Sequence, residues 1–256
     1  MVKMISRLRK SKKNNFRVID LHSHILPGID DGSVDFDTSV ELVKELSSGG
    51  VTDVFATPHY VDETIYVSSR DANKELLKEL VSRLEKEGVN VKVYLGNEIY
   101  ITPRILELLR DKEITVLGKS RYLLVELPMS GDFPGYQDIF LKLIRSGFYV
   151  VLAHPERYTT FQNDFSLVAE LHDMGVLFQC NFGSFVGKYG KTVFRLVSQI
   201  AKAKMIWGMG SDIHRVHGES LIPEAIEKMS KYYTDEELEE ILVKNPQKIL
   251  ESKAKE

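Results

Sequence analysis

Histidines and carboxylates recur in this sequence directly after short apolar runs. His22 and His24 follow the first such run, and an extended backbone points two imidazoles spaced in this way to the same side. Later apolar runs are followed by residues of the same kinds, namely His59, Glu98, Glu126, His154, Asp212 and His214. Imidazole nitrogens and carboxylate oxygens without a thiolate are ligands that suit Mn, Fe and Zn. The spacing therefore predicts a metal centre.

The loop after the first run adds two more carboxylates, Asp30 and Asp31. An Asp-Gly turn accounts for them without any function, but Asp31 can also fold back toward the strand ends. With Asp31, the candidate ligands are five histidines and four carboxylates. Three divalent cations would carry a charge of +6 against −4 on the four carboxylates, which leaves the centre a net charge of +2. Two cations would leave a net charge of zero. A net positive centre attracts a hydroxide and a phosphate dianion together, so we expect hydrolysis of a phosphate ester.

These side chains need a scaffold that brings several strand ends together. Apolar runs predict seven strands, at residues 17–21, 51–57, 89–95, 122–127, 148–153, 176–180 and 205–209. Amphipathic patterns predict helices between them, near residues 35–48, 70–87, 102–110, 136–146, 163–174 and 190–203, and two or three more after residue 221. This alternation indicates an α/β fold, either a closed parallel barrel or a doubly wound sheet. Both architectures place the active site at the carboxyl ends of the strands.

Two of the seven histidines do not follow a predicted strand. His172 lies within a helical pattern, and we assign it a structural role. His217 lies in a loop and belongs either to the rim of a pocket or to plain surface. The other five histidines all follow strands, an arrangement that chance does not easily produce.

Charge is distributed unevenly along the 256 residues, whose net charge is −3. Residues 1–17 hold seven cations and no acid, so the remainder carries −3 − 7 = −10. We expect residues 1–16 to form a basic, solvated tail, with weak attraction to an anionic membrane surface as the alternative. Residues 17–256 are expected to form a single domain. The acidic body disfavours nucleic-acid binding, and we find no secretory signal or membrane-spanning run.

Cys180 is the single cysteine of the chain. One cysteine excludes a disulfide framework within the chain and fits a reducing compartment, so we expect a cytoplasmic protein. A thiol-dependent phosphatase would need an arginine six positions after its cysteine, and this sequence has Val186 there.

Several motifs resemble those of the polymerase-and-histidinol-phosphatase (PHP) superfamily: Asp20-Leu-His-Ser-His24, Thr57-Pro-His59, Ala153-His-Pro-Glu-Arg157 and Ser211-Asp-Ile-His214. The chain is more closely similar to the metal-dependent bacterial protein-tyrosine phosphatases encoded with capsule and exopolysaccharide synthesis. That resemblance runs from about residue 17 to 251. It depends on Asp20-Leu-His-Ser-His-Ile-Leu-Pro-Gly-Ile-Asp-Asp-Gly32, Gly96-Asn-Glu-Ile-Tyr-Ile-Thr102, His154-Pro-Glu-Arg-Tyr158 and Asn245-Pro-Gln-Lys-Ile249.

The resemblance implies a distorted (β/α)7 barrel that holds three divalent metal ions, Mn²⁺ in the first place, with Fe or Zn as alternatives. The first ion would be held by His22, His24, Glu98 and Asp212. The second would share Glu98 as a bridge and add Glu126 and His154. The third would be held by Asp31, His59 and His214.

Members of this family also place arginines against the phosphate. Arg157 matches one of them. Glu219 stands near the place where the phosphatases of Gram-positive type have another, so the sequence departs from the family there. Arg215, directly after His214, is the candidate replacement, with a solvated loop residue as the alternative.

The resemblance implies hydrolysis of phosphotyrosine on the tail of a membrane-anchored capsule or exopolysaccharide tyrosine kinase, by attack of a hydroxide that bridges metal ions. A histidinol-phosphatase or another small-molecule phosphatase is the alternative within the superfamily. A non-catalytic metal-binding module is the alternative from another class. An amidohydrolase also begins with His-x-His, but such barrels usually bridge their metals with a modified lysine, and Glu98 occupies the bridging place here. No oligomeric state is assigned.

Overall fold

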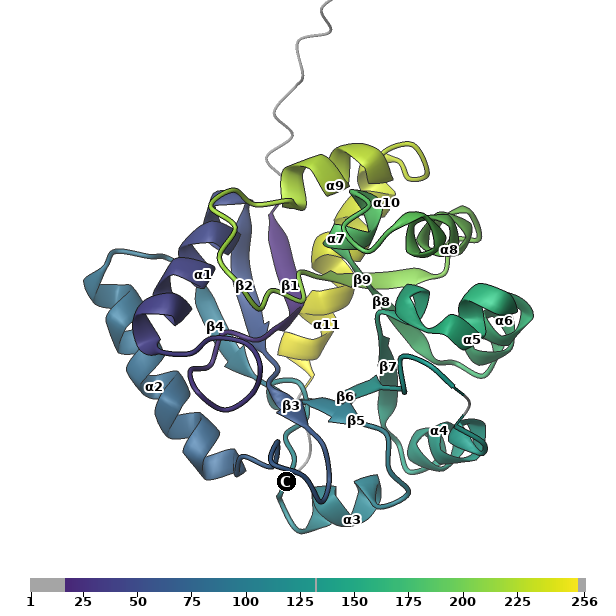
Figure 1. The fold of residues 1–256 in the computed structure, drawn as a ribbon, viewed down its shortest axis with the longest axis horizontal. Helices are drawn as coiled ribbons and strands as arrows, with labels where there is room; N and C mark the ends of the chain where they lie inside the picture. Colours follow the sequence, from purple (N-terminus) through teal and green to yellow (C-terminus); the bar gives the residue numbers. More distant parts are fainter. Residues whose placement is uncertain (1–16, 132, 253–256) are drawn as a thin grey trace, which may run out of the picture.

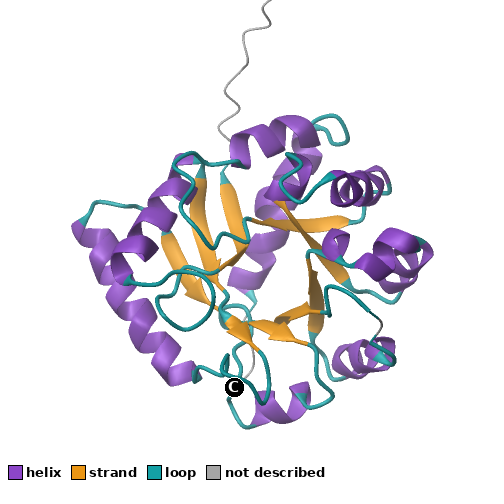
Figure 2. Ribbon diagram, viewed as in Figure 1, coloured by secondary structure: helices purple, strands orange, loops and turns teal. Residues whose placement is uncertain are grey.

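A computed structural model describes residues 17–131 and 133–252. The basic tail predicted at residues 1–16 lies outside the described residues. The described strands form two parallel sheets (Figure 2). One has the order β1 (Val18–Ser23), β2 (Val51–Ala56) and β4 (Lys92–Leu95). The other has the order β3 (His59–Tyr60), β5 (Glu98–Tyr100), β6 (Tyr122–Glu126), β7 (Tyr149–Ala153), β8 (Leu177–Asn181) and β9 (Ile206–Gly210).

The two sheets meet where two chain segments are each interrupted for two residues. β3 follows β2 after Thr57 and Pro58, and β5 follows β4 after a similar break. Backbone pairing continues across the breaks, because Glu98 N donates to Pro58 O at 3.1 Å. The predicted strands at residues 51–57 and 89–95 are therefore present, but each is followed by a short strand that the sequence did not predict. Pro58 has no N–H with which to continue the ladder.

The other edges of the two sheets also meet, between β9 and β1. Asp212 N donates to His22 O at 2.8 Å, and Ser23 pairs in parallel with Ile213. The strands thus surround a common centre, with most helices outside them (Figure 1). The remaining five predicted strands are confirmed to within about two residues at either end.

The larger helices cover the outer faces of the strands. They are α1 (Phe36–Ser48), α2 (Arg70–Lys86), α3 (Ile105–Arg110), α4 (Tyr136–Arg145), α6 (Ser166–Asp173), α8 (Lys191–Lys202) and α9 (Ile222–Met229). Shorter segments complete the described chain: η1 (Pro155–Arg157), α5 (Thr159–Asn163), α7 (Phe182–Phe185), α10 (Asp235–Glu239), the π-helical η2 (Glu240–Lys244) and α11 (Asn245–Glu251). The sequence predicted the larger helices but neither η1 nor α7, which are too short to show a helical period.

Side-chain caps explain where several helices begin. Asp35 accepts from Thr38 N at 2.7 Å at the start of α1. Thr234 and Glu237 form a capping box at the start of α10. Such caps satisfy backbone N–H groups that have no partner within the helix.

Apolar side chains form two cores. The larger lies among strands and outer helices. The smaller contains Leu21, Phe55, Leu124, Val151 and Ile249. Ile249 belongs to α11, a helix that lies near the centre of the ring of strands in Figure 1. Within the described residues, no helix combines the length and the apolar character needed to cross a membrane.

Candidate metal centre

The structure brings all nine predicted ligands together. In the described part of the chain, four groups of side chains offer ligand atoms within 4.8 Å of one another. Their members are His24, Asp31, His59 and His214; His22, His24 and Asp212; His22, Glu98 and His154; and His59, Glu98 and Glu126. The groups share members, so they form one continuous cluster at the carboxyl ends of the strands.

Glu98, the first residue of β5, lies at the middle of this cluster. Its Oε2 is 3.1 Å from His22 Nε2, 3.2 Å from His24 Nε2 and 3.0 Å from His59 Nδ1. Its Oε1 is 2.9 Å from His154 Nε2. Glu98 Oε2 is buried and lacks a hydrogen bond of good geometry, although several imidazoles point at it. A carboxylate surrounded in this way fits a bridge between cations.

Asp212 presents its two oxygens to different groups. Oδ2 accepts from Arg157 Nη1 and from Asn181 Nδ2, each at 2.7 Å. Oδ1 lies 3.5 to 3.7 Å from nitrogens of His22, His24 and His214. One oxygen is therefore held by neutral and cationic donors, while the other faces the ligand cluster.

The Nδ1 atoms of His22 and His24 each have a partner of their own. His22 Nδ1 lies 2.9 Å from Gln179 Oε1, and His24 Nδ1 lies 2.8 Å from Asp30 Oδ2. Such partners fix the tautomer, so that Nε2 of each ring is free to bind a cation. Asp30 also accepts from the backbone N–H of Gly32 and His59.

Gln179 and Asn181 were missed by the sequence analysis. Both belong to β8, whose carboxyl end carries no histidine, aspartate or glutamate. The sequence held a signal for them, because polar side chains at the end of a predicted buried strand are unusual. Asp30 was noted only as a turn residue, and its contact with His24 was not foreseen.

Two of the clustered residues adopt left-handed backbone conformations. His154 has φ 32° and Asp212 has φ 50°, and neither is glycine. Such conformations cost about 1–3 kcal/mol each and persist where the surrounding structure imposes them. The backbone of Gly210 lies close to His22. A Cβ on Gly210 would lie 2.6 Å from the Cβ of His22, so a residue with a side chain would clash there.

The clustered charges shift one another's pKa. Burial lowers the pKa of His22, but the charges of Glu98 and Asp212 outweigh that effect and raise it to about 9. Burial, and then the charge of Glu98, raise the pKa of Glu126 to about 7. Protons therefore compete with cations for these atoms.

A family model described as capsular polysaccharide synthesis, CpsB/CapC, matches residues 18–251. This chain belongs to the CpsB/CapC family. CapC of Staphylococcus aureus is 33% identical to it over 229 residues, 88% of each chain. The tyrosine-protein phosphatase YwqE of Bacillus subtilis (strain 168) is 32% identical over 200 residues, 78% of each chain.

A solved structure of the same family has the same fold. It comes from work on YwqE of Bacillus subtilis and CpsB of Streptococcus pneumoniae, described as unique metal-dependent tyrosine phosphatases. It superposes with a TM-score of 0.85 at 28% identity, over 92% of this chain and 95% of that one. The α/β fold with parallel sheets is thus shared with metal-dependent members of the CpsB/CapC family.

The two arginines that the sequence analysis singled out lie in different surroundings in this CpsB/CapC chain. Arg157 follows His154 in η1 and borders the cluster through Asp212. Arg215 Nη1 lies 2.6 Å from Asp31 O, 2.7 Å from Gly32 O and 2.9 Å from His214 O. Arg215 therefore ties the loop that carries Asp31 to the segment that carries His214.

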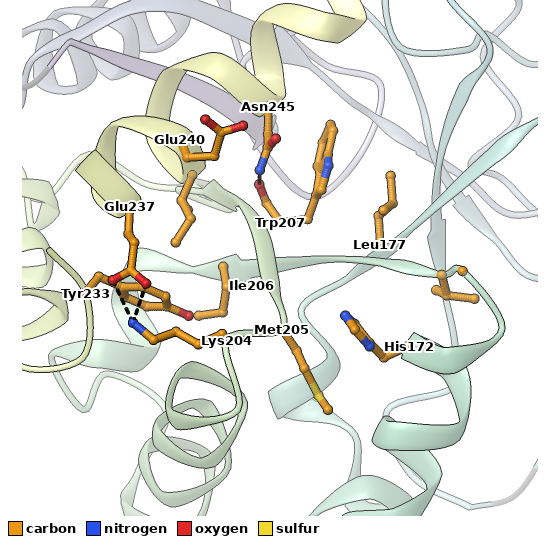
Figure 3. Close-up of a pocket in the computed structure, with 13 residues that line it drawn as sticks. His172, Leu177, Lys204, Met205, Ile206, Trp207, Tyr233, Glu237, Glu240 and Asn245 are labelled. Atoms are coloured by element: carbon orange, nitrogen blue, oxygen red, sulfur yellow. Dashed lines mark hydrogen bonds and ion pairs between the residues drawn. The ribbon is translucent and has the colours of Figure 1, made fainter. Parts of the chain in front are cut away.

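A pocket of about 450 Å³ in this CpsB/CapC chain is lined by none of the nine clustered residues (Figure 3). It opens at the amino ends of β8 and β9, where Leu177 and Ile206 line it, and the ion pair between Lys204 and Glu237 borders it. His172 lines this pocket and belongs to none of the four ligand groups. The sequence analysis had set His172 apart from the metal centre, and its position in this pocket agrees with that.

Proposed function

We propose that this chain is a metal-dependent phosphomonoester hydrolase that removes phosphate from phosphotyrosine. The observation that carries the proposal is the convergence of nine imidazole and carboxylate side chains around Glu98, with the guanidinium of Arg157 at their edge. The tyrosine-protein phosphatase YwqE and the metal-dependent tyrosine phosphatase structure support it.

Three divalent cations, Mn²⁺ in the first place, would occupy the centre, with Fe or Zn as alternatives. The overlap of the four ligand groups supports a centre of more than one ion, because Glu98, His22, His24 and His59 each belong to two of them. The proposed scaffold is a distorted (β/α)7 barrel. The joined edges of the two sheets support it, if β2 with β3 and β4 with β5 each count as one interrupted strand.

The residues of the chain have separable tasks in this reaction. The imidazoles and carboxylates would hold the cations, and bound cations would supply water of lowered pKa and neutralise phosphoryl oxygens. Arg157, held at one nitrogen by Asp212, offers its remaining N–H groups to an equatorial phosphate oxygen. The leaving group is a phenolate with a pKa near 10, so it departs without a general acid.

The proposed partner is a phosphotyrosine tail of a membrane-anchored tyrosine kinase, met in the cytoplasm. The membership in a capsular polysaccharide synthesis family supports this substrate class. Weak attraction of the basic residues 1–16 to an anionic membrane would bring the enzyme to that kinase. The acidic balance of the remaining chain does not favour nucleic acid.

The test compares two substrates on the same protein. After chelation and verified loss of metal, turnover of a phosphotyrosine peptide should vanish and return with Mn²⁺, and it should fall steeply below about pH 6, where protons displace cations from the imidazoles. His172→Ala should keep both metal content and rate.

Faster turnover of histidinol phosphate than of the peptide would favour the small-molecule alternative. Full activity of verified metal-free protein would refute the proposal, and no activity in any metal-loaded form would favour the non-catalytic module.

A further inference from the structure

The guanidinium of Arg157 is held from two directions. Its Nη1 donates to Asp212 Oδ2 at 2.7 Å. Its carbon Cζ lies 4.6 Å from the centre of the Tyr189 ring, in a cation–π arrangement. The Arg157 side chain remains 27% exposed, so part of the guanidinium stays open to a bound anion.

Tyr189 is half-buried beside the cluster. Burial, and then the charge of Asp212, raise the pKa of its hydroxyl and outweigh the opposing effect of the nearby Asn181 side chain, so the ring stays a neutral phenol at physiological pH. At the ring edge, a Cβ on Gly183 would lie 3.1 Å from Tyr189 Cε2. The absence of a side chain at Gly183 therefore lets the ring lie against α7.

Asn181 links this tyrosine to the ligand cluster. Its Nδ2 donates to Asp212 Oδ2 at 2.7 Å, and its Oδ1 accepts from Gln179 Nε2 at 2.8 Å. Its backbone N–H donates to the buried Glu156 at 2.8 Å. The support beneath Tyr189 is thus built from the end of β8, the strand that supplies none of the nine ligands.

We propose that Tyr189 is a positioning residue for phosphate binding, which fixes the Arg157 guanidinium beside the metal centre through its ring. This inference rests on the proposed function. A flexible arginine would lose side-chain freedom each time it bound phosphate. Seated between Tyr189 and Asp212, Arg157 is ordered beforehand, and its planar group keeps one orientation toward the anion.

The experiment measures phosphate binding and turnover in a double-mutant cycle. Inorganic phosphate is titrated into the Mn²⁺-loaded protein by calorimetry, and kcat/KM is measured with a phosphotyrosine peptide. The variants are Tyr189→Leu, Tyr189→Phe, Arg157→Ala and the double variant Tyr189→Leu with Arg157→Ala. Tyr149→Leu is the matched control, because that ring stacks on Tyr122 at the amino end of β7, away from the centre. Metal content and Tm are recorded for each variant.

Tyr189→Leu should weaken phosphate binding and kcat/KM about tenfold, an effect between those of an exposed and a desolvated cation–π contact, as a partly exposed arginine implies. Tyr189→Phe keeps the ring and should stay within about threefold of the wild type. In the Arg157→Ala background, Tyr189→Leu should add no further loss, because its effect passes through Arg157. Tyr149→Leu should change neither quantity.

Other outcomes overturn the inference in separate ways. Losses that multiply in the double variant would show that Tyr189 acts without Arg157. Unchanged phosphate affinity in Tyr189→Leu would remove the positioning role while leaving the proposed function intact. A wild-type protein that neither binds phosphate nor hydrolyses the peptide would instead remove the proposed function. If Tyr189→Leu lowers Tm or metal content, Tyr189→Met takes its place in the same cycle.

Discussion

Arg157 donates from Nη1 to Oδ2 of Asp212 at 2.7 Å, although the two residues are 55 positions apart in the chain. Arg157 follows β7 and Asp212 follows β9, with β8 between them. The other oxygen of Asp212 faces the histidines of the centre. One carboxylate thus joins the group proposed to bind phosphate to the groups proposed to bind cations.

Arg157→Ala should lower kcat/KM for a phosphotyrosine peptide by about 10²–10³-fold, by analogy with the loss of one oxyanion donor. Arg157→Lys should recover only part of this loss, because an ammonium does not copy the planar fork. Steady-state kinetics with metal analysis checks both. Arg121→Ala is the control, since Arg121 also lies over an aromatic ring, Phe148, but far from the centre. Equal rates for the wild type and Arg157→Ala would contradict the assignment.

Glu98→Gln should lower the affinity for Mn²⁺ more than about 100-fold, because partners that only orient a ligand already contribute 10–100-fold. The amide keeps the shape of the side chain but removes the charge that two cations would share. Metal analysis after gel filtration checks this, together with the rate. Glu170→Gln, an exposed position on α6, is the control. Wild-type metal content in Glu98→Gln would rule out the bridging role.

Asp30→Asn should weaken Mn²⁺ binding by about 10–100-fold. The carboxylate accepts from His24 Nδ1 at 2.8 Å, and a neutral amide holds that tautomer less well. Titration of metal-free protein with Mn²⁺ measures the change. Asp173→Asn, at an exposed position, should leave the affinity unaltered. If Asp30→Asn behaves like this control, Asp30 is a turn residue only.

Arg215→Ala should lower the affinity of one ion per chain by about tenfold or more, as loss of an orienting contact does. The reason is that Arg215 holds the carbonyls of Asp31 and Gly32 against the segment of His214. Metal stoichiometry and peptide kinetics distinguish the roles, with Arg195→Ala on α8 as the control. Full metal content with a raised KM would instead support Arg215 as a phosphate ligand.

Asp53→Asn should reduce the free energy of unfolding by about 1–3 kcal/mol at neutral pH, since a buried, charged acceptor is lost. Burial raises the pKa of Asp53, but hydrogen bonds from Thr52, Arg17 and Tyr94 outweigh it and lower the pKa. Because the pKa of Asp53 is lower in the folded state, its stabilisation is fully present at pH values above its pKa in the unfolded state, near 3.9. The stabilisation is lost as the pH falls through the pKa of the folded state.

Urea unfolding of the wild type and Asp53→Asn between pH 7 and pH 3 checks this. The difference between them should be constant above about pH 5 and shrink below it. Asp111→Asn, an exposed position, should change stability by less than about 0.5 kcal/mol. A difference that grows on acidification would contradict the sign of the Asp53 shift.

The sequence by itself determined which side chains gather at the centre. Apolar runs set the strands, parallel strands align their carboxyl ends, and His22, Glu98 and Asp212 each stand at or just beyond such an end. Ligand chemistry is visible in a sequence because it depends on residue type and on position along a strand. The same logic correctly set His172 apart from the ligand groups.

Only the tertiary structure decided how those side chains are oriented. Gln179 and Asn181 are neutral, and nothing in their residue type links them to His22 or Asp212 before β8 is placed beside β9. Arg215 looked suited to phosphate by charge, yet its hydrogen bonds go to backbone carbonyls. Tyr189 lies over Arg157 because the turn between α7 and α8 meets η1. Contacts of this kind depend on distances between remote segments, which residue type and local spacing do not encode.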